Sequence, residues 1–252
     1  MTQGGRGALV TGGGRGIGRA CARILAQGGD RVAVADLDLG PAEETAAAIR
    51  AAGGEAIALR CDVASRADVE GAVERTVREL GGLAVLVACA GVTRDNLVHK
   101  LSDEDWDLVV ATHLRGSFLA AQAAQRPMVA QRYGKIVLMS STSALGNRGQ
   151  ANYAAVKAGI QGLARTLAIE LGPFGVNVNA VAPGFIETRM TRGVAERMGV
   201  DFEQMKAEAA RSIPLRRVGQ PEDVGHVVRF LCSDEASFVS GQVVYVAGGP
   251  RG

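Results

Sequence analysis

The chain has 252 residues, of which 47% are hydrophobic and 21% are charged, the balance of an ordinary globular protein rather than a disordered one. Lysine and arginine total 28 against 26 acidic residues. The resulting net charge of +2 gives no basis for a nucleic-acid-binding surface, so we expect no nucleic-acid partner.

The first predicted unit is a strand, a glycine-rich loop and a helix, in that order. An apolar run at residues 8–10 leads into the sequence TGGGRGIG at 11–18, and an alanine-rich helical stretch follows to about residue 27. Glycines permit a tight turn and a close approach to a pyrophosphate, and a helix N-terminus presents free N–H groups to phosphates. Because 34 glycines make chance matches common, the strand, loop and helix context is what favours dinucleotide binding. The expected contacts are Gly12, Arg15, Gly16, Ile17 and Gly18.

The end of the second predicted strand bears on the choice between NAD(H) and NADP(H). The strand at residues 31–35 ends at Asp36, about twenty residues after the loop, where a carboxylate accepts hydrogen bonds from the adenosine ribose. The same carboxylate would repel a 2′-phosphate and therefore favours NAD(H). Arg15 is the opposing indication, since a guanidinium in the loop is able to bind that phosphate and so keeps NADP(H) open. We give Asp36 the greater weight.

Helices and strands alternate through the middle of the chain. The expected elements are a helix at 41–52, a strand at 56–59, a helix ending near 80, a strand at 83–88, a helical stretch at 102–132 and a strand at 135–139. This alternation predicts parallel βαβ units with ligand sites at the carboxyl ends of the strands. Asp62 and Val63 follow the third strand, where Asp62 is a candidate adenine contact, a cap for the helix starting near Ser65, or both. Ala90 and Gly91 follow the fourth strand, where small residues let a cofactor lie against the backbone.

Tyr153 and Lys157 are four residues apart, about one turn of the helix that we expect to reach residue 171. A free tyrosine has a pKa near ~10 and is a poor proton donor at neutral pH. A positive charge ~4 Å away, at an effective dielectric constant of ~20, favours the phenolate by ~4 kcal/mol, or up to about three pKa units. The pair is therefore a candidate proton donor near neutrality, and the alternative is a surface tyrosine beside a solvated lysine.

The C-terminal third completes the sheet and covers it. A sixth strand at 176–181 runs into further candidate cofactor contacts at Pro183, Gly184, Ile186 and Thr188. Residues 189–213 are rich in methionine, arginine and alanine, and we expect them to form helices that cover the substrate pocket. A helix at 223–233 and a strand at 242–247 follow. Because no repeat, low-complexity tract or linker interrupts the chain, residues 1–252 are interpreted as one domain.

The cysteines and the hydropathy pattern bear on location. The four cysteines lack any CxxC spacing, which is typical of a reduced, cytoplasmic protein, and we expect no metal site. No apolar stretch reaches the ~18 residues that a membrane span needs, and residues 1–7 contain no apolar segment of signal-peptide length. We therefore expect a cytoplasmic protein without a membrane partner.

Taken together, these motifs resemble those of the short-chain dehydrogenase/reductase family from end to end, and within it the bacterial 3-oxoacyl-carrier-protein reductases. The resemblance depends on TGGGRGIG at 11–18, Asp62-Val63, GNRGQANY at 146–153, YAAVK at 153–157 and NAVAPGFIET at 179–188. It implies a single α/β domain with a Rossmann-like, doubly wound sheet of seven parallel strands, and by analogy a homotetramer. The implied reaction is NAD(P)(H)-dependent reduction of a 3-oxoacyl thioester, carried by coenzyme A or acyl carrier protein, to the 3-hydroxyacyl thioester.

The resemblance also implies catalytic roles. Tyr153 would donate the proton to the substrate oxygen, Lys157 would lower its pKa, and both would contact the nicotinamide ribose, while a serine polarises the carbonyl. The family's spacing counted back from the tyrosine gives Ser140, whereas counting forward along the strand gives Ser141. A deletion inside the strand would reverse the facing of later side chains, but the loop at 142–148 loses a residue at little cost. We therefore expect Ser141.

Several positions depart from the family pattern. His113 stands where the family has asparagine, so it either holds the water of the proton relay or packs the helix. The sequence ACAG at 88–91 replaces NNAG and removes two amide side chains. Arg132 matches one basic carrier-docking position, but Phe174 replaces the other, and the segment after Thr188 is longer. Both differences favour a coenzyme A thioester.

Two other functions remain open from the sequence. One is an alcohol, steroid or sugar dehydrogenase on the same scaffold, because the shape of the pocket decides the substrate. The other is a non-catalytic cofactor-binding sensor or assembly subunit, for which His113 and the altered sequence at 88–91 are the only indications.

Overall fold

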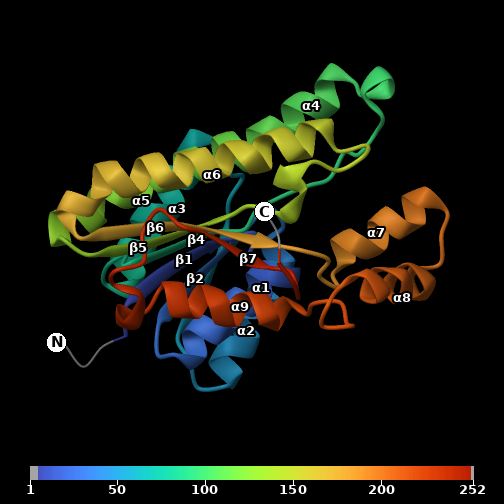
Figure 1. The fold of residues 1–252 in the computed structure, drawn as a ribbon. Coiled ribbons are helices and arrows are strands. Elements are labelled where there is room, and N and C mark those ends of the chain that lie inside the picture. The colour runs from blue at the N-terminus through green and yellow to red at the C-terminus, as the bar shows by residue number, and fades with distance from the viewer. Residues whose placement is uncertain (1–4, 251–252) are drawn as a thin grey trace.

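A parallel seven-stranded sheet forms the centre of the molecule, with helices on both faces (Figure 1). The computed structural model describes residues 5–250, so the ends of the predicted 1–252 domain, residues 1–4 and 251–252, lie outside the described residues. The strand order is β3-β2-β1-β4-β5-β6-β7, and the chain reverses its direction of winding between β1 and β4, where such folds bind ligands. The strands are β1 (Gly7–Thr11), β2 (Arg31–Asp36), β3 (Ala56–Arg60), β4 (Val85–Ala88), β5 (Gly134–Met139), β6 (Val176–Pro183) and β7 (Val243–Val246). The predicted doubly wound α/β domain is therefore confirmed.

The central strands are unbroken apolar runs because both faces of the sheet are covered. Every residue of β1, β4 and β5 is buried. One core packs the sheet against α3 (Arg66–Leu80), α5 (Gly116–Gln131) and α6 (Ala151–Leu171), with Leu119 and Ile160 among its members. The other packs it against α1 (Gly16–Gln27), α2 (Leu39–Ala51) and α9 (Pro221–Leu231), with Leu25 and Leu231. Two independent cores fix the sheet and, with it, the loops at the strand ends.

The helices follow the predicted order with one exception. They are α1 (Gly16–Gln27), α2 (Leu39–Ala51), α3 (Arg66–Leu80), α4 (Asp103–Val109), α5 (Gly116–Gln131), α6 (Ala151–Leu171), α7 (Arg189–Met198), α8 (Phe202–Ser212) and α9 (Pro221–Leu231). The stretch predicted as one helix over 102–132 is divided, because a π-helical segment, Val110–Arg115, joins α4 to α5. Such segments often occur at functional sites, and this one carries His113. Within residues 5–250, no helix has both the length and the apolar character that a membrane crossing requires.

Candidate active site

A cavity of about 1250 Å³ opens at the carboxyl ends of the strands. Loops that follow β1 to β6 form its floor, and α7 and α8 lie over one end. Every site residue predicted from the sequence lines this cavity: Gly12, Arg15, Gly16, Ile17, Gly18, Asp36, Asp62, Val63, Ala90, Gly91, His113, Ser141, Tyr153, Lys157, Pro183, Gly184, Ile186 and Thr188. The residues that the sequence analysis singled out therefore lie together around one cavity.

The glycine loop fits a dinucleotide. Gly12 has φ +64°, and a Cβ there would lie 2.7 Å from the backbone of Ala90 on the neighbouring strand end. A Cβ on Gly18 would lie 2.1 Å from the carbonyl of Gly12, so only glycine lets α1 begin this close to β1. Arg15, the N-cap residue of α1, makes no side-chain cap bond, and the first turn contains no acid. The first N–H groups of α1 are therefore available to a pyrophosphate.

Three charged side chains line the end of the cavity that follows β2. Asp36 is held by two backbone bonds, accepting from the N–H of Gly14 at 2.9 Å and of Asp38 at 3.2 Å. Asp38 in turn forms an ion pair with Arg15, whose Nη1 lies 3.0 Å from its Oδ2. Asp36 is thus fixed beside the glycine loop, the position predicted for a ribose contact.

Asp62 does not cap α3, so that prediction is wrong. The N-cap residue is Ser65, whose hydroxyl accepts from the N–H of Asp68. Asp62 Oδ1 instead accepts from the N–H of Ala64 at 2.9 Å and shapes the turn that borders the cavity. The predicted contact with the adenine is the role that remains for Asp62.

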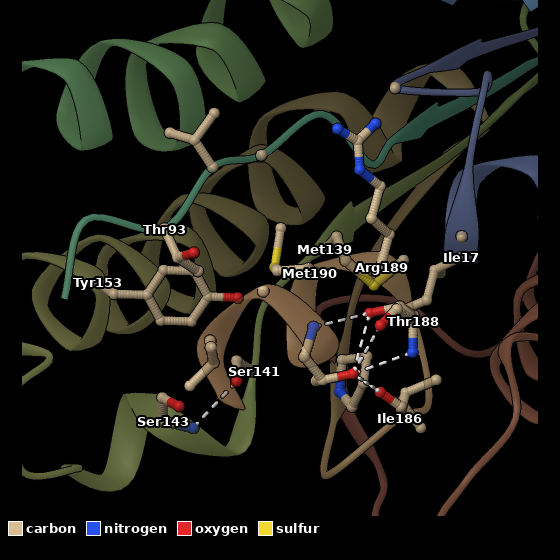
Figure 2. Close-up of a pocket in the computed structure, with 18 of the residues that line it drawn as sticks. Ile17, Thr93, Met139, Ser141, Ser143, Tyr153, Ile186, Thr188, Arg189 and Met190 are labelled. Atoms are coloured by element: carbon tan, nitrogen blue, oxygen red, sulfur yellow. Dashed lines mark hydrogen bonds between the residues drawn. The ribbon is translucent and has the colours of Figure 1, made fainter. Parts of the chain in front are cut away.

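The two adjacent serines have different surroundings. Ser140 is 2% exposed and donates to the carbonyl of Lys157 at 2.9 Å, which ties β5 to α6. Ser141 is half-buried, accepts from the N–H of Ser143 at 3.1 Å, and lies close enough to Tyr153 to oppose the rise in the pKa of that phenol. Ser141 and the hydroxyl of Tyr153 both face the cavity in Figure 2, across from Met190. This geometry agrees with the strand-based count rather than with the spacing from the tyrosine.

Burial controls the protonation of Tyr153 and Lys157. Burial raises the pKa of Tyr153 to about 12, opposed by the hydrogen bond with Ser141. Lys157 is 3% exposed, and burial lowers the pKa of its ammonium group to about 7. Its Nζ donates to the carbonyl of Met139 and lies 5.3 Å from the centre of the Tyr153 ring, with no hydrogen bond to the phenol oxygen. The expectation that the lysine lowers the pKa of the tyrosine is therefore wrong for this structure.

His113 is buried between the loop after β4 and Tyr153. It is 2% exposed, and its Nε2 lies 3.0 Å from the nitrogen and 2.8 Å from the oxygen of Val92. Its ring meets the Tyr153 ring edge-on, with centres 5.2 Å apart, while Nδ1 is buried without a hydrogen-bond partner. Burial, and then the charge of Lys157, lower the pKa of His113 to about 3, so the imidazole is neutral. A Cβ on Gly91 would lie 2.4 Å from this ring.

Two residues around the site, Asn152 and Arg197, were not foreseen from the sequence. Asn152 is fully buried; its amide donates to the carbonyl of Arg94 at 2.9 Å, and its Oδ1 accepts from the N–H of Tyr153 at 2.7 Å. Asn152 therefore orients the first turn of α6. Its position directly before Tyr153 is the feature of the sequence that could have indicated this role. Arg197 on α7 donates to the hydroxyl of Thr93 at 2.9 Å, which joins the cover helix to the loop after β4. No sequence spacing indicated that contact.

Comparison with known proteins assigns the family. A family model described as enoyl-(acyl carrier protein) reductase matches residues 12–250. The short-chain reductase protein NovJ of Streptomyces niveus is 46% identical over 242 residues, which cover 96% of this chain and 92% of that protein. This chain belongs to the short-chain dehydrogenase/reductase family. As a member of it, the protein is an NAD(P)-dependent oxidoreductase.

Other members of the short-chain dehydrogenase/reductase family match this chain in sequence or structure over nearly its whole length. The 3-oxoacyl-[acyl-carrier-protein] reductase FabG of Escherichia coli is 39% identical over 244 residues, covering 96% of each chain. The crystal structure of levodione reductase matches with a TM-score of 0.93 and 33% identity, covering 97% of this chain and 96% of that one. A putative short-chain alcohol dehydrogenase from Sinorhizobium meliloti matches with a TM-score of 0.91 and 38% identity, covering 98% and 96%.

Proposed function

We propose that this enzyme reduces a 3-oxoacyl thioester to the 3-hydroxyacyl thioester with NADH. The observation that carries the proposal is the meeting of Ser141, Tyr153 and Lys157 in the cavity that holds the glycine loop. The substrate class is supported by the 3-oxoacyl-[acyl-carrier-protein] reductases, to which the chain is similar over almost its whole length.

The proposed roles follow from the protonation states of the side chains. When bound, the nicotinamide supplies hydride to the carbonyl carbon of the substrate. Tyr153 keeps its proton because its pKa is raised to about 12, so it is a donor to the carbonyl oxygen in the direction of reduction. Ser141 would polarise the same oxygen. Lys157, with a pKa lowered to about 7, both binds and releases protons near neutrality and would return one to Tyr153.

We propose that His113 holds a water molecule through which a proton is returned to Tyr153. Its Nε2 is bonded to the backbone of Val92, its Nδ1 is buried without a partner, and its ring lies edge-on to the ring of Tyr153. A neutral imidazole nitrogen accepts or donates a hydrogen bond as readily as the asparagine that the family pattern places here. His113 itself would remain neutral during this transfer, because its pKa is lowered to about 3.

The remaining parts of the proposal concern the cofactor, the carrier and the assembly. Asp36 favours NADH over NADPH. Residues 189–213 would cover the acyl group, supported by the methionines Met190 and Met205 on the cavity wall. A coenzyme A thioester is favoured because Phe174 replaces a docking charge and Arg132 is bonded to the carbonyl of Pro173. A cytoplasmic homotetramer is proposed from the family resemblance and the four free cysteines.

A direct test compares substrates and cofactors. NADH and NADPH would each be tested with acetoacetyl-CoA and with a matched acyl-carrier-protein thioester. In a parallel assay, the oxidised cofactors would be tested with simple secondary alcohols. We expect the fastest turnover with NADH and acetoacetyl-CoA. Turnover of the alcohols alone would support the second candidate, a dehydrogenase of small alcohols, which the structural match to a putative short-chain alcohol dehydrogenase favours. Cofactor binding without turnover of any substrate would support a sensor.

A further inference from the structure

The cavity end that follows β2 contains a charge arrangement beyond Asp36. Arg15 and Asp38 form an ion pair there at 3.0 Å, with 42% and 61% of their side chains exposed. Arg15, Asp36 and Asp38 all line the cavity, so this end has two carboxylates against one guanidinium. The pair stands at the position where a 2′-phosphate of NADP(H) would need an unpaired cation.

The other nearby cations are engaged elsewhere. Arg19 donates to the carbonyl of Gly14 at 2.9 Å and pairs with Glu44 at 3.0 Å. Arg60, beside Asp36 in the sheet register, lies 3.7 Å from Asp68. Neither Arg19 nor Arg60 lines the cavity. Among residues 5–250, Arg15 is therefore the guanidinium that lines this end of the cavity, and its ion pair with Asp38 decides whether it is available to a ligand.

Asp36 and Asp38 act in different ways. Asp36 accepts from two backbone N–H groups, and a Cβ on Gly14 would lie 2.8 Å from its Oδ2, so its carboxylate is fixed in the loop. Asp38 makes its contact through a side chain that is more than half exposed, and its partner is Arg15 rather than the backbone. Asp36 thus presents a fixed hydrogen-bond acceptor to the cavity, whereas Asp38 forms an ion pair with the guanidinium of Arg15.

We propose that Asp38 is a second determinant of cofactor choice, a positioning residue that occupies Arg15 and adds its own negative charge against a 2′-phosphate. This inference rests on the proposed function, in that the cavity binds a nicotinamide dinucleotide. Guanidinium binds phosphate by charge-assisted, often bidentate hydrogen bonds, which a competing carboxylate weakens. Removing that carboxylate frees Arg15 for the phosphate. An exposed ion pair is weak by itself, so its loss leaves the fold intact.

The test measures binding without substrate. NADH and NADPH would be titrated into wild type, Asp38→Asn, Arg15→Leu and the double variant, following nicotinamide fluorescence, with 2′,5′-ADP and AMP as competitors. Asp38→Asn should bind NADPH about tenfold more tightly, which is about 1.4 kcal/mol, and NADH within about threefold of wild type. Most of the gain should disappear when Arg15 is also replaced. The affinity for 2′,5′-ADP should rise in Asp38→Asn, and the affinity for AMP should not.

Glu44→Gln is the matched control, because it removes a carboxylate from Arg19 outside the cavity and should leave the NADPH to NADH ratio unchanged. Thermal unfolding of each variant checks that the fold is retained. An unchanged ratio in folded Asp38→Asn would overturn the inference. A gain that persists at full size without Arg15 would show that Asp38 does not act through Arg15, and would overturn that part of the inference. If wild type binds neither dinucleotide, the proposed function fails, and this inference fails with it.

Discussion

Ser141 and Ser140 are neighbours in sequence, but their contacts differ. Ser140 donates to the carbonyl of Lys157, whereas Ser141 lies close enough to Tyr153 to influence its pKa. We predict that Ser141→Ala lowers kcat at least a hundredfold, because it removes one donor to the developing oxyanion. Ser140→Ala should retain most of the kcat and lose about 1–3 kcal/mol of unfolding free energy, since Gln161 and a backbone carbonyl lose a buried partner.

Steady-state kinetics and urea unfolding of both serine variants check this prediction. Thr142→Ala, in the next position, is the control and should change neither quantity by much. A dead Ser140→Ala enzyme together with a nearly normal Ser141→Ala enzyme would contradict the strand-based assignment.

His113 makes the folded protein sensitive to acid. Its pKa is about 3 in the folded state and about 6.5 when unfolded, so below pH 6.5 the unfolded chain binds a proton that the folded protein excludes. The stability contributed by the neutral ring is present above pH 6.5 and is lost as the pH falls toward 3. At pH 5 this one group should cost about 2 kcal/mol relative to pH 7.5.

We predict that His113→Asn removes this acid-dependent loss, whatever its effect at neutral pH. Urea unfolding at pH 7.5 and pH 5 measures the difference for wild type and variant. His99→Asn, on an exposed residue, is the matched control and should behave as wild type. Equal pH dependence in wild type and His113→Asn would contradict the buried, neutral state of the ring.

The helices α7 and α8 form a cover that stands apart from the sheet at one end of the cavity (Figure 1). Arg197 on α7 reaches Thr93, and Lys206 on α8 pairs with Glu187 at 3.0 Å. We predict that Arg197→Ala raises KM for the thioester about two- to fivefold, because an exposed hydrogen bond contributes about 0.5–1 kcal/mol. The affinity for NADH should stay unchanged.

Substrate kinetics and NADH titration of Arg197→Ala test the role of this contact. Arg211→Ala is the control, since Arg211 lies on α8 but its side chain does not line the cavity. A fall in NADH affinity with KM unaltered would show that the contact serves the cofactor half of the cavity instead.

At the same scale, the sequence predicted regular elements well and their interruptions poorly. The apolar runs of β1, β4 and β5 identified buried parallel strands because both faces are covered. The π-helical turn was missed, since hydrophobic periodicity at 102–132 fits a continuous helix equally well. The one-turn spacing of Tyr153 and Lys157 was right, but their depth of burial, which decides their pKa values, depends on packing across the sheet and is absent from local sequence.

Across the whole molecule, a partly buried network holds the amino ends of the strands, opposite the cavity. Arg6 pairs with Asp30 at 2.8 Å and donates to the hydroxyl of Tyr133 and the carbonyl of Cys232, both at 2.8 Å. It joins the start of β1 to the loop before β2, the start of β5 and the end of α9. Asp30 is 5% exposed, so removing Arg6 would leave a carboxylate buried without its partner.

We predict that Arg6→Ala lowers the free energy of unfolding by about 3 kcal/mol while NADH binding is retained. Denaturant unfolding and NADH titration measure the two quantities. Arg75→Ala is the control, because it breaks an exposed pair with Glu79 and should cost less than about 1 kcal/mol. Equal losses in the two variants would contradict the structural role of this network.

The network around Arg6 lies at the amino ends of the strands, and the cavity with Tyr153 lies at their carboxyl ends. The contacts that stabilise the fold and the residues of the site are thus separated in space. The central claim is that Tyr153 donates the proton to the substrate oxygen. The most direct measurement is the rate of NADH consumption with acetoacetyl-CoA by Tyr153→Phe, with NADH affinity measured on the same preparation. We predict a loss of about a thousandfold in kcat with NADH affinity preserved, whereas turnover close to that of the wild type would contradict the account.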